Sequence, residues 1–252
     1  MKRPVKILLI VLGAVVVAVL VLVANISRAH STVQGVEVDI RYGRTPRLVN
    51  DQVVKDSIFA AIPALLQYRV CDVDCGQVAE AAARVPYLDE VHTSMSVSGK
   101  VVVSARQRRP VARLYYGTDE LYFDAAGGIM PASTIGSCNV LVAGGDFVEP
   151  LRADSLNAQM VALLQLATFL DRESKYGDLI DQIYVERDGD LMMVPKLGNH
   201  IVELGKTNDL EEKFVNLLAF YRKGMPRAGW NTYSRVSLKF KDQVVCTKRE
   251  SK

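Results

Sequence analysis

The sequence predicts an α+β protein in three parts: a single N-terminal transmembrane helix, a β-α-α-β-β domain, and a mixed α/β domain with a C-terminal edge sheet. Three observations predict this fold. Residues 7–26 contain no charged side chain, residues 36–105 show the patterns of one strand, two helices and two strands, and residues 121–246 combine strand pairs with helices. Apolar residues recur at every second position in the strands and three or four positions apart in the helices.

The apolar run at residues 7–26 is long enough for a membrane anchor. Twenty helical residues at about 1.5 Å each cover roughly the 30 Å of a bilayer's hydrocarbon layer. Basic residues at positions 2, 3 and 6 outnumber Arg28 and His30 beyond the run, which predicts a cytoplasmic N-terminus. A cleaved signal peptide is the alternative, because residues 27–29 offer small side chains at the cleavage positions. Its apolar core is usually shorter, roughly 7–15 residues, so we expect an uncleaved anchor.

Composition limits the possible partners and cofactors. The whole chain has 31 basic and 28 acidic residues, for a net charge of +3. Nucleic-acid-binding proteins concentrate basic residues in a stripe, so this balance gives no support for a nucleic-acid partner. Four cysteines, at 71, 75, 138 and 246, leave disulfides and free thiols equally open. Cys71 and Cys75 alone make a poor zinc site, because structural zinc takes four ligands.

The first domain begins with the alternating strand Val36 to Ile40. Asn50 can cap a helix that ends before Pro63, and Asp74 or Cys75 opens a second helix. Two strands follow, Val91 to Val97 and Val101 to Ala105, with Ser98-Gly99 as the tight turn between them.

The second domain combines strand pairs with two helices. Turn residues mark the hairpins, and an Asn208–Glu211 capping box followed by Gly224 marks one helix. The predicted elements are a hairpin of 121–123 and 129–130, a short strand at 139–142, a helix from Asp154 or Ser155, a hairpin of 183–185 and 191–194 around Asp188-Gly189, a strand at 200–205, a helix from Asn208 to Gly224, and final strands at 235–240 and 243–246.

Several motifs carry a family resemblance. Val85 to Val91 is similar to the "P-x-V-x-x-V" entry into the second strand of a POTRA domain, and the strand–helix–helix–strand–strand order before residue 106 resembles that domain. Val101 to Ala112 resembles "V-x-V-x-E-R-x-P-V-A" of the bacterial cell-division family FtsQ/DivIB, with Ala105 where the family usually has Glu. Tyr122 to Pro131 resembles its "Y-x-x-D-x-x-G-x-x-x-P" hairpin, and Tyr233 to Lys248 resembles the form found in Bacteroidetes.

The resemblance implies a domain plan and a location. The parts are a cytoplasmic tail 1–6, a transmembrane helix 7–26, a linker 27–35, a POTRA domain 36–114, an FtsQ-type β domain 115–248 and a tail 249–252. It implies a single-pass protein of the inner membrane with periplasmic domains, concentrated at the division septum. There it is expected to be a scaffold of the divisome that links early and late division proteins by binding FtsB and FtsL.

The resemblance also places the partner site. In the family, the terminal strand region of the β domain receives a strand from FtsB, and β-strand addition explains why an open edge attracts an extended peptide. The matching residues are Phe240, Lys241, Asp242, Gln243, Val244, Val245, Cys246 and Thr247. Phe240 aligns with an aromatic residue of the family's partner-binding strand. Val244 and Val245 could instead simply complete the core sheet, and both interpretations can hold together. We expect proline at position 245 to abolish partner capture.

The sequence gives no reason to expect catalytic, metal-binding or cofactor-binding residues, or a small-molecule substrate. It shows no HExxH, G-x-S-x-G or P-loop spacing, and Asp188 and Asp190 fit a solvated turn. The alternative function is a membrane-tethered hydrolase or transferase of envelope polymers. Such an enzyme needs a nucleophile–base pair or close carboxylates in a cleft. A transporter component is a third possibility, but it would need a long series of barrel strands after the POTRA part.

Overall fold

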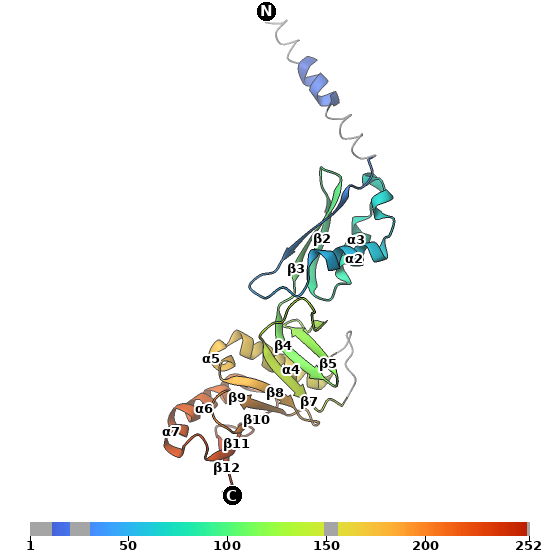
Figure 1. Cartoon of the computed structure of the whole chain (residues 1–252). Helices are drawn as coiled ribbons and strands as arrows, with labels where there is room; N and C mark the ends of the chain where they lie inside the picture. The colour runs from blue at the N-terminus through green and yellow to red at the C-terminus, as the bar shows by residue number, and fades with distance from the viewer. Residues whose placement is uncertain (1–11, 21–30, 149–155, 251–252) are drawn as a thin grey trace, which may run out of the picture. The chain divides into compact units, whose positions relative to one another are not determined.

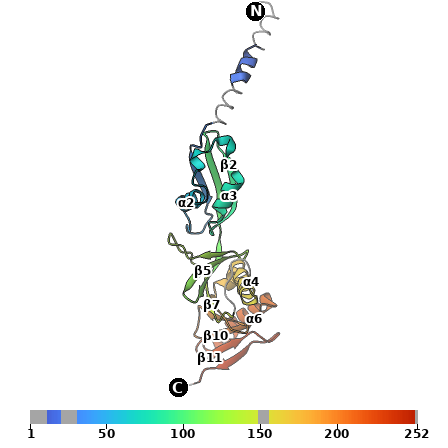
Figure 2. The same ribbon diagram turned by 90° about the vertical axis from the view of Figure 1, so that its right-hand side faces the viewer.

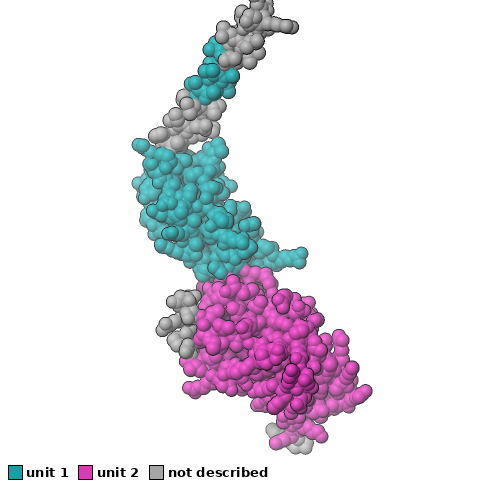
Figure 3. Space-filling view, turned by 180° about the vertical axis from the view of Figure 1, so that it is seen from behind, with its two compact units in different colours: residues 1–108 teal, residues 109–252 magenta. Residues whose placement is uncertain are grey.

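The computed structural model describes residues 12–20, 31–148 and 156–250 (Figure 1). The chain divides between residues 108 and 109 into two compact units, which Figure 3 shows in different colours. The sequence-based boundary falls six residues later, after residue 114. Residues 110–116 form one strand, β4 (Pro110–Tyr116), and its partners β5 and β7 all lie in the second unit. Strand pairing therefore assigns the whole of β4 to that unit.

The α+β fold class is confirmed, with mixed sheets in both units, but the predicted single N-terminal transmembrane helix over residues 7–26 is corrected. Among the described residues, none of the helices has both the length and the apolar character needed to cross a membrane. Of the predicted span, residues 12–20 are described, as helix. At about 1.5 Å per residue they cover roughly half of a bilayer's hydrocarbon layer. Residues 1–11 and 21–30 lie outside the described residues.

The first unit is a three-stranded sheet with two helices on one of its faces (Figure 1). In chain order its elements are β1 (Gly35–Arg41), α2 (Asp51–Ala61), the short 3-10 turns η1 (Leu65–Gln67) and η2 (Val70–Asp72), α3 (Cys75–Ala83), β2 (Leu88–Met95) and β3 (Lys100–Gln107). The strand order is β1-β3-β2, with β1 parallel and β2 antiparallel to the central β3. Ala105 is fully buried in β3, so a charged residue at this position would lie in the core.

Local capping sets the starts of both helices in this unit. The Asn50 side chain accepts the N–H of Val53 at 3.0 Å, and Asp74 accepts that of Gly76 at 2.8 Å. These bonds satisfy backbone donors that a helix leaves unpaired at its N-terminus. Both caps lie where the sequence predicts them.

The second unit is one nine-stranded sheet in the order β12-β11-β10-β9-β8-β7-β4-β5-β6. Beyond β4, the strands are β5 (Asp119–Asp124), β6 (Ile129–Pro131), β7 (Leu141–Gly145), β8 (Ile180–Val185), β9 (Leu191–Pro195), β10 (Ile201–Gly205), β11 (Tyr233–Ser237) and β12 (Val245–Lys248). The helices are α4 (Ala158–Arg172), α5 (Ser174–Gly177), α6 (Leu210–Lys223) and α7 (Met225–Ala228).

Helices α4 and α6 cover the same face of this sheet (Figure 2). Leu163 and Leu166 of α4 and Phe214 and Leu217 of α6 join one buried cluster with the inward-facing strand residues, which include Ala143, Met193, Val202 and Val236. The alternate residues of the strands point to the other face, where Tyr184 and Arg235 are exposed. One covered and one solvated face is the usual arrangement for a sheet made mainly of antiparallel pairs.

Two predicted helix starts differ from the structure. The start at Asp154 or Ser155 lies outside the described residues, and α4 begins at Ala158, capped by Asn157. The Asn208 capping box does not form: α6 begins at Leu210 behind Asp209, which has φ +54° and makes no side-chain cap. The Asn208 amide donates instead to the Asp209 carboxylate at 3.1 Å.

Gly145 is needed where β7 lies against β8. A Cβ atom at this position would lie 2.3 Å from the carbonyl oxygen of Val185 and 2.7 Å from its nitrogen. Because both obstacles are backbone atoms, Gly145→Ala has to separate the two strands, and we expect it to lower the free energy of unfolding by about 1–3 kcal/mol. Urea unfolding at neutral pH measures this loss.

The neighbouring Gly144 is the control for that substitution. Its added Cβ would come no closer than 3.9 Å to the nearest atom, the carbonyl oxygen of Tyr115. Gly144→Ala is expected to change stability by less than about 1 kcal/mol. Equal losses for the two variants would contradict the steric explanation.

Candidate partner-binding edge of the sheet

The candidate site is the outer edge of β12, the last strand of the second unit. In the strand order of the sheet, β12 stands at the end and has β11 as its single neighbour among the described residues. The two strands run antiparallel, with Val236 opposite Cys246 and Ser237 opposite Val245. The other side of β12 therefore presents backbone groups to which a further strand can be added.

Three of the eight sequence-predicted site residues lie in β12: Val245, Cys246 and Thr247. The other five, Phe240 to Val244, belong to the connection from β11, in which Asp242 has the left-handed φ of +58°. The predicted final strands, 235–240 and 243–246, are thus displaced from the observed ones. The turn around Asp242 takes up residues that the apolar pattern had assigned to strands.

The side chains of this segment divide between the two faces of the sheet. Val244 and Cys246 are half-buried and pack against the core of the second unit. Val245 is 42% exposed and Phe240 is 54% exposed. The two interpretations of the valines therefore apply to different residues: Val244 completes the core, whereas Val245 lies at the surface beside the edge.

Hydrogen bonds fix which backbone groups of β12 point outward. Arg249 donates its N–H to the carbonyl of Thr232 at 2.9 Å, and the carbonyl of Thr247 accepts from the Ser234 hydroxyl at 3.3 Å. On the far side of β11, Leu238 donates to the carbonyl of Glu203 in β10 at 2.8 Å. Successive residues of a strand turn their backbone groups to opposite neighbours.

This alternation assigns the backbone groups of Val245 and Thr247 to β11 and those of Cys246 and Lys248 to the open edge. Proline at position 245 would thus remove a hydrogen bond within the β11–β12 ladder, and its expected effect on partner capture stays a prediction. Cys246 and Lys248 carry the donors and acceptors that an added strand needs.

A shallow pocket of about 170 Å³ lies beside this edge, between the start of α6 and the connection from β11. Its lining includes Asn208, Glu212, Asn216, Phe240, Lys241 and Gln243. A hydrogen bond with Asp242 is the main cause that raises the pKa of Glu212, with desolvation second. The pocket therefore combines an exposed aromatic ring with charges of both signs, and it adjoins the residues that lead into β12.

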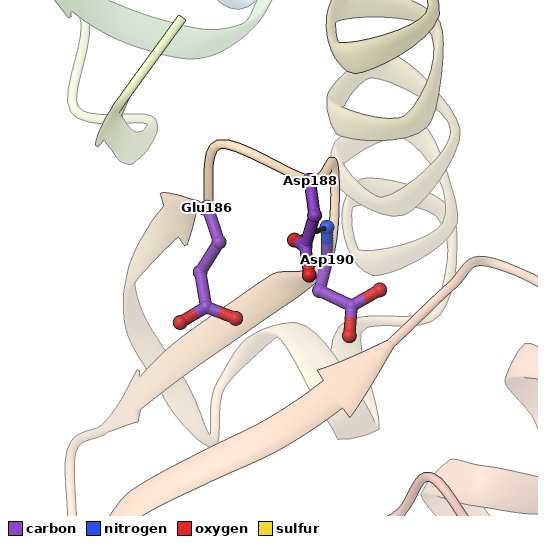
Figure 4. A group of neighbouring side chains, drawn as sticks. All are labelled: Glu186, Asp188 and Asp190. Atoms are coloured by element: carbon purple, nitrogen blue, oxygen red, sulfur yellow. Dashed lines mark hydrogen bonds between the residues drawn. The ribbon is translucent and has the colours of Figure 1, made fainter.

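An acidic group holds the neighbouring strand ends in place. Glu186, Asp188 and Asp190 lie at the tip of the β8–β9 hairpin (Figure 4). The two oxygens of Asp190 pair with Lys206, at 3.0 Å, and with Lys239, at 2.7 Å. These lysines, Lys239 first, hold the pKa of Asp190 below its usual range. The lysine ammonium groups already supply positive charge to Asp190. Asp190 therefore links the start of β9 by ion pairs to the ends of β10 and β11.

We expect Asp190→Asn to lower the free energy of unfolding by about 1 kcal/mol, a modest value because both lysines are partly exposed. The lowered pKa of Asp190 fixes the sign of the pH dependence: the stabilisation is complete above the carboxyl's ordinary pKa and is lost as the pH falls through its folded-state pKa. Urea unfolding at neutral and at acidic pH tests this, and the difference from wild type should shrink in acid. Glu186→Gln is the control, and an equal loss there would contradict the assignment.

These features define an α+β protein whose candidate site is a sheet edge. The sequence model of the family described as "FtsQ/DivIB, C-terminal related" matches residues 109–247, more than half of the chain. The chain therefore belongs to the FtsQ/DivIB family. The match begins just before β4 and ends at Thr247 within β12, so it covers the candidate edge except for Lys248. A search of curated proteins finds no match to this chain.

Family membership gives the chain a role in cell division, in association with other division proteins and at the division septum. The family is one of non-enzymatic division scaffolds. Two features of the site escaped the sequence-based interpretation. Lys248 belongs to β12 although the predicted site ends at Thr247, and Asp190 ties together strand ends that are far apart in the sequence. The last fourteen residues contain five basic and two acidic side chains, and this basic character is a sequence signal that includes Lys248.

Proposed function

We propose that this protein is a divisome scaffold that binds FtsB- and FtsL-type division proteins by β-strand addition at β12, and that it thereby links early and late division proteins. The observation that carries the proposal is the open edge of β12, where Cys246 and Lys248 turn their backbone groups away from β11. The partner-binding residues are those from Phe240 to Thr247, with Lys248 added.

The physical gain comes from backbone hydrogen bonds and from the apolar surface beside them. Each bond of an added strand contributes about 0.5–1.5 kcal/mol net, because it replaces a bond to water. Val245 and Phe240 are exposed next to the edge. Their burial by the partner would add the apolar term that a short four-residue strand needs.

The opposite end of the sheet is a weaker site for strand addition. Strand β6 has three residues and ends at Pro131, which has no N–H to donate. Ala132, just beyond it, donates its N–H to Glu120 of β5 at 2.9 Å. The β12 edge is therefore the better template of the two.

The proposal includes the domain assignments. Residues 36–108 correspond to a POTRA domain and residues 109–248, which include the whole of β4, correspond to the FtsQ-type β domain, both in the periplasm. The observed element order β1, α2, α3, β2, β3 supports the POTRA assignment. The edge strands β1 and β2 of that unit offer a second place for peptides to bind.

Capture from cell extracts tests the function. The full chain is compared with a chain that ends at Lys239, after circular dichroism has shown that both are folded. We expect the full chain to retain small coiled-coil division proteins and the shorter chain to lose them. Equal capture by both chains would move the binding surface away from β12. No capture by either folded chain would remove the main support for the scaffold role.

A further inference from the structure

Arg249, the residue that follows β12, is hydrogen-bonded to a turn that lies far away in the sequence. Arg249 donates its backbone N–H to Thr232 at 2.9 Å, and its guanidinium donates to the carbonyl of Asn199, in the turn before β10. The first bond continues the β11–β12 ladder, and the second crosses to another part of the chain. Together they hold the C-terminal end of β12 in the sheet.

His200 lies directly after that turn and is almost fully buried, at 2% exposure. Its Nε2 lies 2.8 Å from the hydroxyl of Tyr221 in α6, and the two rings meet edge to face. Its Nδ1 is buried and has no hydrogen-bond partner in the part of the chain that the structure describes. A Cβ added to Gly198 would lie 2.9 Å from that nitrogen, so backbone closes off this side of the ring.

Protonation would be costly at this position. A protonated imidazole has two N–H donors, and here Tyr221 supplies one acceptor while Nδ1 has none. The titratable groups that act on the ring are the Arg249 guanidinium and the Tyr221 phenol. Burial raises the pKa of that phenol. Among the described residues, no carboxylate pairs with His200. Burial first, and the charge of Arg249 second, lower the pKa of His200.

We propose that Arg249 and His200 form a pH-sensitive latch for β12: Arg249 holds the end of the strand in the sheet while His200 is neutral, and protonation of His200 releases it. The coupling is reciprocal, because a guanidinium that disfavours imidazolium is itself disfavoured by imidazolium to the same extent. The stabilisation is present above the ordinary pKa of histidine and is lost as the pH falls through the lowered one. Release of β12 would remove the edge to which the partner is proposed to bind, so an effect of pH on partner binding rests on the proposed function.

The first test measures the coupling itself. The full chain, labelled at its three histidines, is titrated by NMR, with His30→Gln and His92→Gln to assign the signals. We expect Arg249→Gln to raise the titration midpoint of His200, and Lys248→Gln to leave it nearly unchanged. Arg249→Lys keeps the positive charge, so we expect it to leave the midpoint of His200 closer to that of wild type than Arg249→Gln does, whereas loss of burial alone would raise the midpoint in both variants. The same midpoint in wild type and in Arg249→Gln would overturn the proposal.

The second test measures release of the strand. Hydrogen exchange of the β12 amides, corrected for the intrinsic effect of pH, is compared at pH 7.5 and pH 5.5. We expect wild type to lose protection by about fivefold or more in acid, and His200→Phe and His200→Gln to lose much less. Equal losses in wild type and in both variants would exclude His200 as the trigger. If neither variant folds, the Arg249→Gln titration decides alone. No partner is present in either test, so these outcomes are independent of the proposed function.

Discussion

Cys246→Pro is expected to weaken capture of the proposed partner strongly while most of the sheet stays intact. Proline has no N–H, and at this position the missing donor is one that points to the open edge. The proline ring also projects toward the place where the added strand would lie. We expect affinity to fall by roughly tenfold or more, which corresponds to about 1.4 kcal/mol. Capture by the full chain carrying the substitution measures this loss.

The controls separate the backbone from the side chain. Cys246→Ala removes the half-buried thiol and keeps the N–H, so we expect it to retain capture. Val245→Pro removes a donor that faces β11 and should reduce amide protection within the β11–β12 pair. If Cys246→Pro captures its partner as well as wild type, with normal protection in β11, strand addition at this edge is wrong.

The sequence predicts the local features of this fold well. Asn50 and Asp74 cap their helices because the donors they satisfy lie two or three residues away. Asn208 does not cap α6, and the reason lies in the backbone of its neighbour Asp209. The chain turns through a left-handed Asp209 before α6, and the Asn208 amide bonds that neighbour instead of the helix. A cap motif is therefore informative only when the backbone before the helix is extended.

The edge of the sheet shows where sequence reasoning ends. The apolar run from Val244 to Cys246 indicates a strand, but which of its backbone groups point outward depends on how β12 pairs with β11 and β11 with β10. The sequence therefore identifies the segment, while the outward direction of Cys246 requires the hydrogen bonds of three strands. Contacts such as Lys239 with Asp190, or Arg249 with Asn199, join residues about fifty apart and leave no local pattern.

Phe214→Ala is expected to cause the largest loss of stability. Phe214 is fully buried in α6, and its ring centre lies 5.1 Å from that of Tyr176 and 5.3 Å from that of Phe169. These rings join α6 to α4 and α5. Removing one of them leaves a cavity in the core, which costs about 3–5 kcal/mol for a buried phenylalanine. Because folded domains are stable by only about 5–15 kcal/mol, the second unit would lose a large part of its stability.

Urea unfolding followed by tryptophan fluorescence measures this loss in one unit, because the single tryptophan, Trp230, lies in the second unit and packs against Tyr221. Phe240→Ala is the matched control: that ring is 54% exposed, and its removal should change stability by less than about 0.5 kcal/mol. Far-UV circular dichroism of the same samples should show the unfolding transition of the first unit at an unchanged urea concentration, because that unit has its own buried core. Equal losses for the two phenylalanine variants would show that the aromatic cluster does not hold the helices on the sheet. Simultaneous loss of the first unit would show that the two cores do not unfold independently.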